Sequence, residues 1–135
     1  MNPTPQSFPP GVGAITFADG LPGFETCRHY VVLASPALEP FMCVQGLGDQ
    51  APSFLAIDPR LVVEDYKCEI GPSDRRRLET PAGRPLLWLA IVSPDADGAK
   101  VNLRAPLVIN PETMRGVQLL EGDQAYSLDH RLTGG

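Results

Sequence analysis

The sequence predicts an all-β fold with one short helix: a small antiparallel β-barrel-like fold of about 8–10 short strands. Fifteen prolines and thirteen glycines make up about a fifth of the 135 residues, and both residue types break helices and favour turns. Apolar residues gather in short runs, and the connections between the runs are too short for the crossovers that parallel strands need. A twisted antiparallel sheet of this size usually closes into a barrel or a sandwich, which limits exposed edges.

The first half of the chain contains five of the expected strands. They are residues 14–17, 30–33, 41–45, 54–57 and 66–70. Each run is short, and proline or glycine residues separate it from the next. Between the first two strands, residues 19–25 hold two glycines and a proline, which fix special backbone angles. We expect Leu21 and Phe24 to fill the core from this corner.

Two helical segments are expected. Asp58 followed by Pro59 is typical of an N-cap and a first helical position, and predicts a single turn over residues 60–63. Residues 73–79 are the best helix candidate, with Ser73 as the cap.

The one basic cluster, Arg75–Arg77, lies in the expected helix. Consecutive helical residues point about 100° apart, so the three side chains should not form a compact patch. We expect them to be solvated and partly paired with Asp74 and Glu79.

The second half begins with residues 86–92, the most hydrophobic run of the chain, which contains Trp88. This run predicts a core strand that stops at Ser93-Pro94. Asp97-Gly98 is a strong hairpin signal, and residues 100–104 should return from it.

Residues 101–110 form the expected frame of the sheet. The alternation over residues 101–104 predicts a strand with one wet face, and Pro106 then interrupts the ladder because it has no N–H to donate. Residues 107–110 follow as a buried strand. Residues 114–120 should return beside it, with Gly116 adopting a positive φ or a bulge.

The chain is expected to form one domain. Residues 1–13 carry four prolines and two glycines and should be a flexible tail, whereas residues 14–135 should be a single β domain. Tyr126 is expected in a last short strand, and residues 132–135 should fray.

Charge and cysteine content restrict the class of protein. The net charge of −5 argues against a general nucleic-acid binder, which needs a cationic surface, and favours a basic partner. The three cysteines are isolated in sequence and predict buried free thiols in a reducing compartment. The first residues resemble no signal peptide, and no apolar run has the length of a membrane span, so we expect a cytoplasmic protein.

No catalytic or metal-binding pattern stands out. The chain lacks a Gly-x-Ser-x-Gly elbow, a glycine-rich phosphate loop and cysteine pairs at zinc spacing. Cys27 and His29 stand two residues apart without a second pair. We therefore expect no enzyme activity, no cofactor and no metal.

Several segments, in order and at compatible spacing, resemble the flagellar assembly factor FliW family. The first, residues 15–25, reads Ile-Thr-Phe-Ala-Asp-Gly-Leu-Pro-Gly-Phe-Glu. The others are residues 54–59, 65–66, 89–92, 101–110 and 116–118. The resemblance runs from about Ile15 to Tyr126.

The resemblance implies a cytoplasmic, non-catalytic protein with a small β-barrel-like fold. Members of this family bind the RNA-binding translational repressor CsrA and relieve repression of flagellin mRNA. They also bind flagellin, which draws FliW away from CsrA and closes a feedback loop. We expect this chain to be a monomer on its own, without direct nucleic-acid or membrane binding.

If the partner surface is acidic, the candidate contact residues are Glu64, Asp65 and Tyr66, together with Asn102 as an outward polar residue of the central strand. Tyr66 is equally well interpreted as a tyrosine at the edge of the core. Two alternatives stay open: a small barrel that binds an apolar ligand, and a nucleic-acid-binding module that uses Arg75–Arg77.

Overall fold

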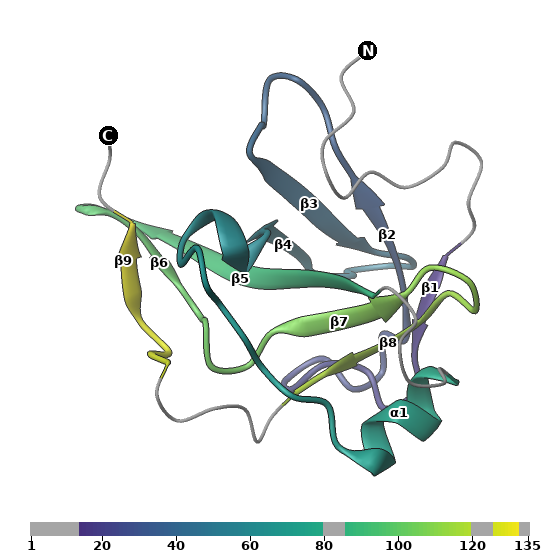
Figure 1. The fold of residues 1–135 in the computed structure, drawn as a ribbon. Helices are drawn as coiled ribbons and strands as arrows, with labels where there is room; N and C mark the ends of the chain where they lie inside the picture. The colour runs from purple at the N-terminus through teal and green to yellow at the C-terminus, as the bar shows by residue number, and fades with distance from the viewer. Residues whose placement is uncertain (1–13, 80–85, 120–125, 133–135) are drawn as a thin grey trace.

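Figure 1 shows the computed structural model of the chain, which describes residues 14–79, 86–119 and 126–132. Strand β5 (Leu87–Asp95) is the longest strand of this part, and it pairs with three others. The remaining strands are β1 (Ile15–Phe17), β2 (His29–Leu33), β3 (Phe41–Gly46), β4 (Ser53–Ile57), β6 (Gly98–Val101), β7 (Leu107–Asn110), β8 (Arg115–Gln118) and β9 (His130–Leu132). The helical elements are η1 (Pro59–Leu61), a 3-10 turn, and α1 (Pro72–Leu78).

Seven strands close into a barrel in the order β4-β3-β2-β1-β8-β7-β5, and the pairing of β4 with β5 closes it. Strands β6 and β9 extend the sheet beyond β5. Adjacent strands are antiparallel, apart from the parallel pair β1 and β8. The predicted all-β, mainly antiparallel barrel with one short helix is confirmed.

The barrel interior is filled by apolar side chains. Tyr30 and Phe17 are the largest of them, and their rings meet edge to face with centroids 5.5 Å apart. The buried members of this interior cluster are Ile15, Phe17, Leu21, Tyr30, Met42, Val44, Ala56, Leu89, Leu107 and Ile109. Small barrels normally fill their centre in this way.

Two smaller apolar clusters lie outside the barrel. Segment 58–70, which begins with η1, packs through Tyr66 and Val62 on the outward side chains of β4, β5 and β6. Helix α1 packs through Leu78 on Val108 and Val117, from strands β7 and β8. Strand β7 is therefore covered on both faces, by the interior cluster through Leu107 and Ile109 and by α1 over Val108, which explains its continuous apolar run.

Asn110 fixes the end of α1 on the barrel. Its Nδ2 donates to the carbonyl oxygen of Leu78 at 2.9 Å, and the Thr113 hydroxyl donates to the same oxygen at 3.0 Å. The helix begins at Pro72 with Gly71 as its N-cap, so the expected Ser73 cap is wrong. Proline in the first turn loses no hydrogen bond there, which explains the earlier start.

The predicted strand over residues 66–70 is wrong, because none of these residues is in a strand. The Tyr66 hydroxyl instead donates to the carbonyl oxygen of Leu103 at 2.7 Å, and the Lys67 N–H donates to the Tyr126 hydroxyl at 2.8 Å. Hydrogen bonds between side chains and backbone, instead of a strand ladder, therefore fix the position of this segment.

Several boundaries also differ from the expectation, most of all those of β5, β6 and the last strand. Strand β5 does not stop at Ser93-Pro94, because its pairing with β4 ends at Val92 and the free edge tolerates a proline. The return strand β6 ends at Val101, three residues early. The last strand is β9, which includes Leu132, and Tyr126 precedes it.

The corner after β1 also departs from the expectation in one residue. Leu21 is buried, as predicted, but Phe24 is 42% exposed. The Phe24 ring packs edge to face on Phe54, with centroids 5.6 Å apart, and keeps much of its surface in solvent. The three cysteines are free but half-buried rather than buried. The expected tail, residues 1–13, lies outside the described residues.

Gly116 is required for close packing. The predicted positive φ or bulge is wrong, because its φ is not positive and the pairing of β7 with β8 is uninterrupted. A Cβ built on Gly116 would lie 2.7 Å from Cε2 and Cζ of the Phe17 ring. The parallel strands β1 and β8 therefore approach each other where Gly116 leaves room for Phe17.

We predict that Gly116→Ala destabilises the fold by about 1–3 kcal/mol, because the added methyl group overpacks the interior. Urea unfolding monitored by circular dichroism measures this change. Gly71→Ala is the matched control, since nothing lies within 4 Å of its added Cβ. A loss equal to that of the control, or one that persists undiminished in a Phe17→Ala background, would contradict the packing explanation.

Two buried tyrosines give a matched pair. The Tyr66 hydroxyl is bonded to Leu103, whereas the Tyr30 hydroxyl has no hydrogen-bond partner of good geometry among the described residues and has the Cys27 thiol as a neighbour. Tyr66→Phe should cost about 1–2 kcal/mol, because it leaves the Leu103 carbonyl without its donor. Tyr30→Phe should instead stabilise by about 1 kcal/mol. Equal effects in urea unfolding would contradict this contrast.

The pH dependence of stability tests the same environment of Tyr30. Burial first, and then the neighbouring Cys27 thiol, raises the pKa of the Tyr30 hydroxyl well above its ordinary value. Above pH of about 10 the unfolded chain loses this proton and the folded chain keeps it, so stability falls as pH rises. The stability advantage of Tyr30→Phe over the natural chain should be constant from about pH 7 to 9 and widen above about pH 10. An advantage that stays constant up to pH of about 11 would argue against a buried, neutral hydroxyl.

Candidate functional site

The predicted acidic contact residues lie on the segment that follows η1. Asp58 caps this turn: its Oδ1 accepts from the Arg60 N–H at 2.9 Å, and its carboxylate pairs with the Arg60 guanidinium at 3.1 Å. The chain then passes through Val63, and the side chains of Glu64 and Asp65 are exposed. Both carboxylates are therefore presented to solvent by a capped, anchored turn.

Tyr66 and Asn102 contribute mainly to structure. Tyr66 is only 7% exposed, and the centroid of its ring lies 4.5 Å from the centroid of the Tyr126 ring. Asn102 follows β6 and does not lie on a strand. Its Oδ1 accepts from the N–H groups of Arg104 and Ala105, at 3.1 and 3.0 Å, which closes an Asx-type turn. The Tyr66–Leu103 bond brings the acidic segment next to this turn.

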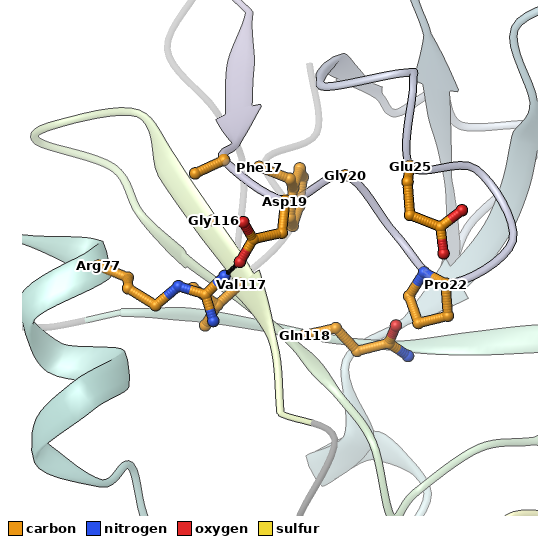
Figure 2. A pocket seen from close by; sticks show the side chains of 10 residues that line it. Phe17, Asp19, Gly20, Pro22, Glu25, Arg77, Gly116, Val117 and Gln118 are labelled. Atoms are coloured by element: carbon orange, nitrogen blue, oxygen red, sulfur yellow. Dashed lines mark ion pairs between the residues drawn. The ribbon is translucent and has the colours of Figure 1, made fainter.

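A pocket of about 340 Å³ lies elsewhere, between the corner after β1, the end of α1 and strand β8 (Figure 2). Its lining residues come from three distant segments of the chain. They are Phe17, Ala18, Asp19, Gly20, Pro22, Glu25, Arg77, Gly116, Val117 and Gln118.

Glycine at two positions gives the corner its shape. Gly20 and Gly23 have φ angles of 66° and 86°, in the region that favours glycine. A Cβ on Gly20 would lie 2.7 Å from the Cα of Glu25, so the two ends of the corner touch. The Phe24 N–H donates to the Leu21 carbonyl oxygen at 2.7 Å and completes a tight turn.

The charged side chains of the pocket lie on opposite walls. On one wall Arg77 from α1 is ion-paired with Asp19 (Figure 2). The Arg77 guanidinium also lies 3.7 Å from the Asp74 carboxylate. On the other wall the Glu25 carboxylate accepts from the Gly23 N–H at 3.0 Å. This backbone hydrogen bond lowers the pKa of Glu25, so the carboxylate is ionised at neutral pH. Gln118 donates from Nε2 to the Ala105 carbonyl oxygen.

The ionisable side chains of the pocket are those of Asp19, Glu25 and Arg77. Its lining contains no serine, cysteine, histidine or lysine that could act as a nucleophile or a base at neutral pH. Within residues 14–79, 86–119 and 126–132, no group of three or more histidine, cysteine or acidic side chains could hold a metal ion. In the same part of the chain, no helix is long and apolar enough to cross a membrane.

The sequence reasoning placed the contacts on the segment 64–66 and at Asn102, and it missed this pocket. The sequence predicts a structural corner over residues 19–25 and a solvated Arg77, and neither prediction indicates a pocket. Pairing of Arg77 with Asp74 is confirmed, whereas Glu79 pairs with Arg115 at 3.9 Å. One feature of the sequence could have indicated the pocket. The family-like segment 15–25 contains two acidic residues, Asp19 and Glu25, that are not needed to form the core.

Comparisons with known proteins all point to one family over most of the chain. Residues 10–132 match the family described as FliW protein. The flagellar assembly factor FliW of Thermosipho africanus is 35% identical over 122 residues, which cover 88% of this chain and 84% of that protein. The flagellar assembly factor FliW of Treponema denticola is 34% identical over 118 residues, covering 86% and 80%.

A solved structure shares the fold. The crystal structure of a flagellar assembly factor FliW superimposes with a TM-score of 0.81 at 25% identity, and the match covers 90% of this chain and 86% of that one. The sequence match and the barrel agree with each other, and both extend over nearly the whole chain. This chain therefore belongs to the FliW family.

Proposed function

We propose that this protein is a non-catalytic regulator of flagellum assembly that binds a CsrA-type translational repressor and also flagellin. Binding of the repressor relieves repression of flagellin mRNA, and free flagellin competes for the protein and so limits its own synthesis. The observation that carries the proposal is membership of the FliW family over residues 10–132. The relatives named above are flagellar assembly factors.

The physical properties of the chain support a role in binding proteins. The interior positions of the barrel are occupied by side chains, which leaves the outside for recognition. The net charge of −5 favours association with a basic protein such as an RNA-binding repressor. We also propose that the protein acts in the cytoplasm, as a monomer when unbound, and without a cofactor.

The two alternatives gain no support from these observations. A barrel that holds an apolar ligand needs an open centre, and the interior cluster fills it. Nucleic-acid binding through Arg75–Arg77 needs cationic side chains, and Arg77 is engaged by Asp19 and Asp74.

We further propose that the exposed carboxylates of Glu64 and Asp65 contact one of the two partners, with Tyr66 and Asn102 holding them in place. Tyr66 bonds the segment to Leu103, and Asn102 closes the turn that contains Leu103. Carboxylates on an anchored segment lose little freedom on binding, which favours affinity.

We predict that the protein forms a complex with CsrA or flagellin of its own organism at micromolar concentrations, measured by isothermal titration calorimetry. The double variant Glu64→Gln, Asp65→Asn should weaken one complex by about tenfold, mainly through loss of charge attraction. Asp49→Asn with Asp97→Asn is the matched control, because both side chains are exposed and the change in charge is the same.

The two parts of this proposal fail separately. If the natural protein binds neither partner, the function is wrong. If it binds, but both double variants behave alike with both partners, the function stands and the placement of the contact on Glu64 and Asp65 is wrong.

A further inference from the structure

We propose that the pocket between the corner after β1, helix α1 and strand β8 receives a lysine or arginine side chain of a protein partner, with Glu25 as its counterion. The inference deepens the proposed function, since the side chain belongs to a protein that this regulator binds. It names a second contact surface, apart from the segment 64–66.

The charges of the pocket do not cancel. The Arg77 guanidinium is matched by Asp19 and lies close to Asp74 as well. Among the described residues, Glu25 has the Gly23 N–H as its partner and no cation within ion-pair distance. The solvent-exposed Glu25 carboxylate thus has no cation beside it among the described residues, and a basic side chain of a partner can form an ion pair with it.

The apolar part of the lining suits the stem of such a side chain. Pro22 is exposed and lies beside the Glu25 carboxylate, whereas the buried residues Phe17 and Val117 line the pocket nearer Asp19 and Arg77 (Figure 2). Lysine and arginine place their methylene groups on apolar surface and keep the charged end near polar groups. A volume of 340 Å³ is at the lower end for ligand pockets, and it fits a side chain better than a large cofactor.

An anion fits the same pocket less well. The cation that could attract it, Arg77, already has Asp19 as a partner, and an anion would have to displace that carboxylate. It would also lie in a pocket that the ionised Glu25 carboxylate lines.

The pocket is formed before any partner binds. Two glycines with positive φ fix the turn, and the N–H groups of Gly20, Phe24 and Cys27 each donate to a backbone carbonyl of the same corner, at 2.7–3.0 Å. The floor is strand β8, which pairs with both β1 and β7. A preformed site avoids the cost of ordering a loop on binding.

An NMR titration of the isotope-labelled natural protein tests the inference directly. The probes are two capped tripeptides, alanine-lysine-alanine and alanine-norleucine-alanine, which differ only in the ammonium group. The lysine peptide should shift the amide signals of Gly23, Val117 and Gln118, and should bind about threefold to fivefold more tightly than the norleucine peptide at low salt. High salt should reduce the difference.

Variants locate the effect. Glu25→Gln keeps an oxygen that can accept from the Gly23 N–H, so the corner should persist while the preference for lysine is lost. Asp97→Asn removes the same charge from an exposed position at the β5–β6 hairpin and should keep the preference. Equal shifts with both peptides on the natural protein, or shifts only away from the pocket, would overturn the inference even if Glu25→Gln were to misfold.

The same variants separate this inference from the proposed function. If CsrA or flagellin binds the natural protein, Glu25→Gln should weaken at least one complex more than Asp97→Asn does. Equal behaviour of the two variants in both complexes overturns the pocket as a contact and leaves the function intact. If neither partner binds, the proposed function fails, and the peptide titration still decides whether the pocket selects a cation.

Discussion

The closure of the barrel at β5 is the constraint on which the rest of the structure depends. One edge of this strand pairs first with β7 and then with β6, and the other edge pairs with β4. The link between β6 and β7 must therefore leave the ladder and return to it. Asn102 satisfies two backbone N–H groups of this link, and Pro106 has no N–H that needs a partner. These two residues lower the free-energy cost of interrupting the hydrogen-bond ladder, and so allow the seven-stranded barrel to close.

Closure in turn determines where recognition can occur. In a closed barrel, few edges are free and the described interior positions carry packed apolar side chains, so the loops and outer segments are the parts best placed to recognise a partner. Both candidate surfaces fit this description. The segment of Glu64 and Asp65 covers the outer face of β4, β5 and β6, whereas the pocket of Glu25 lies where β1, β8 and α1 meet.

The strands could be predicted from the sequence because their signals are local. Short apolar runs and the Asp97-Gly98 turn were sufficient for the hairpin of β5 and β6. Residues 66–70 show the limit of this reasoning, because their apolar side chains alternate as in a strand, yet Tyr66 is held by a bond to Leu103, 37 positions away. The pocket could not be predicted from the sequence for the same reason. It depends on the parallel pairing of β1 with β8 and on the docking of Leu78, which places Arg77 opposite Asp19.

The separation of the two surfaces bears on how two partners could compete. Coupling through the protein would need an element with two discrete arrangements, and the barrel between the surfaces is closed and filled with packed side chains. The corner around Gly20 is fixed by hydrogen bonds within the backbone, and the turn around Asn102 by hydrogen bonds from backbone N–H groups to the Asn102 side chain, so neither resembles a switch. If the proposed function is right, competition between a repressor and flagellin would follow most simply from overlap of the two large partners on the outside of one rigid body. Such overlap would need no change in the shape of the barrel, and the position of each contact, rather than any internal motion, would then determine which partner is bound.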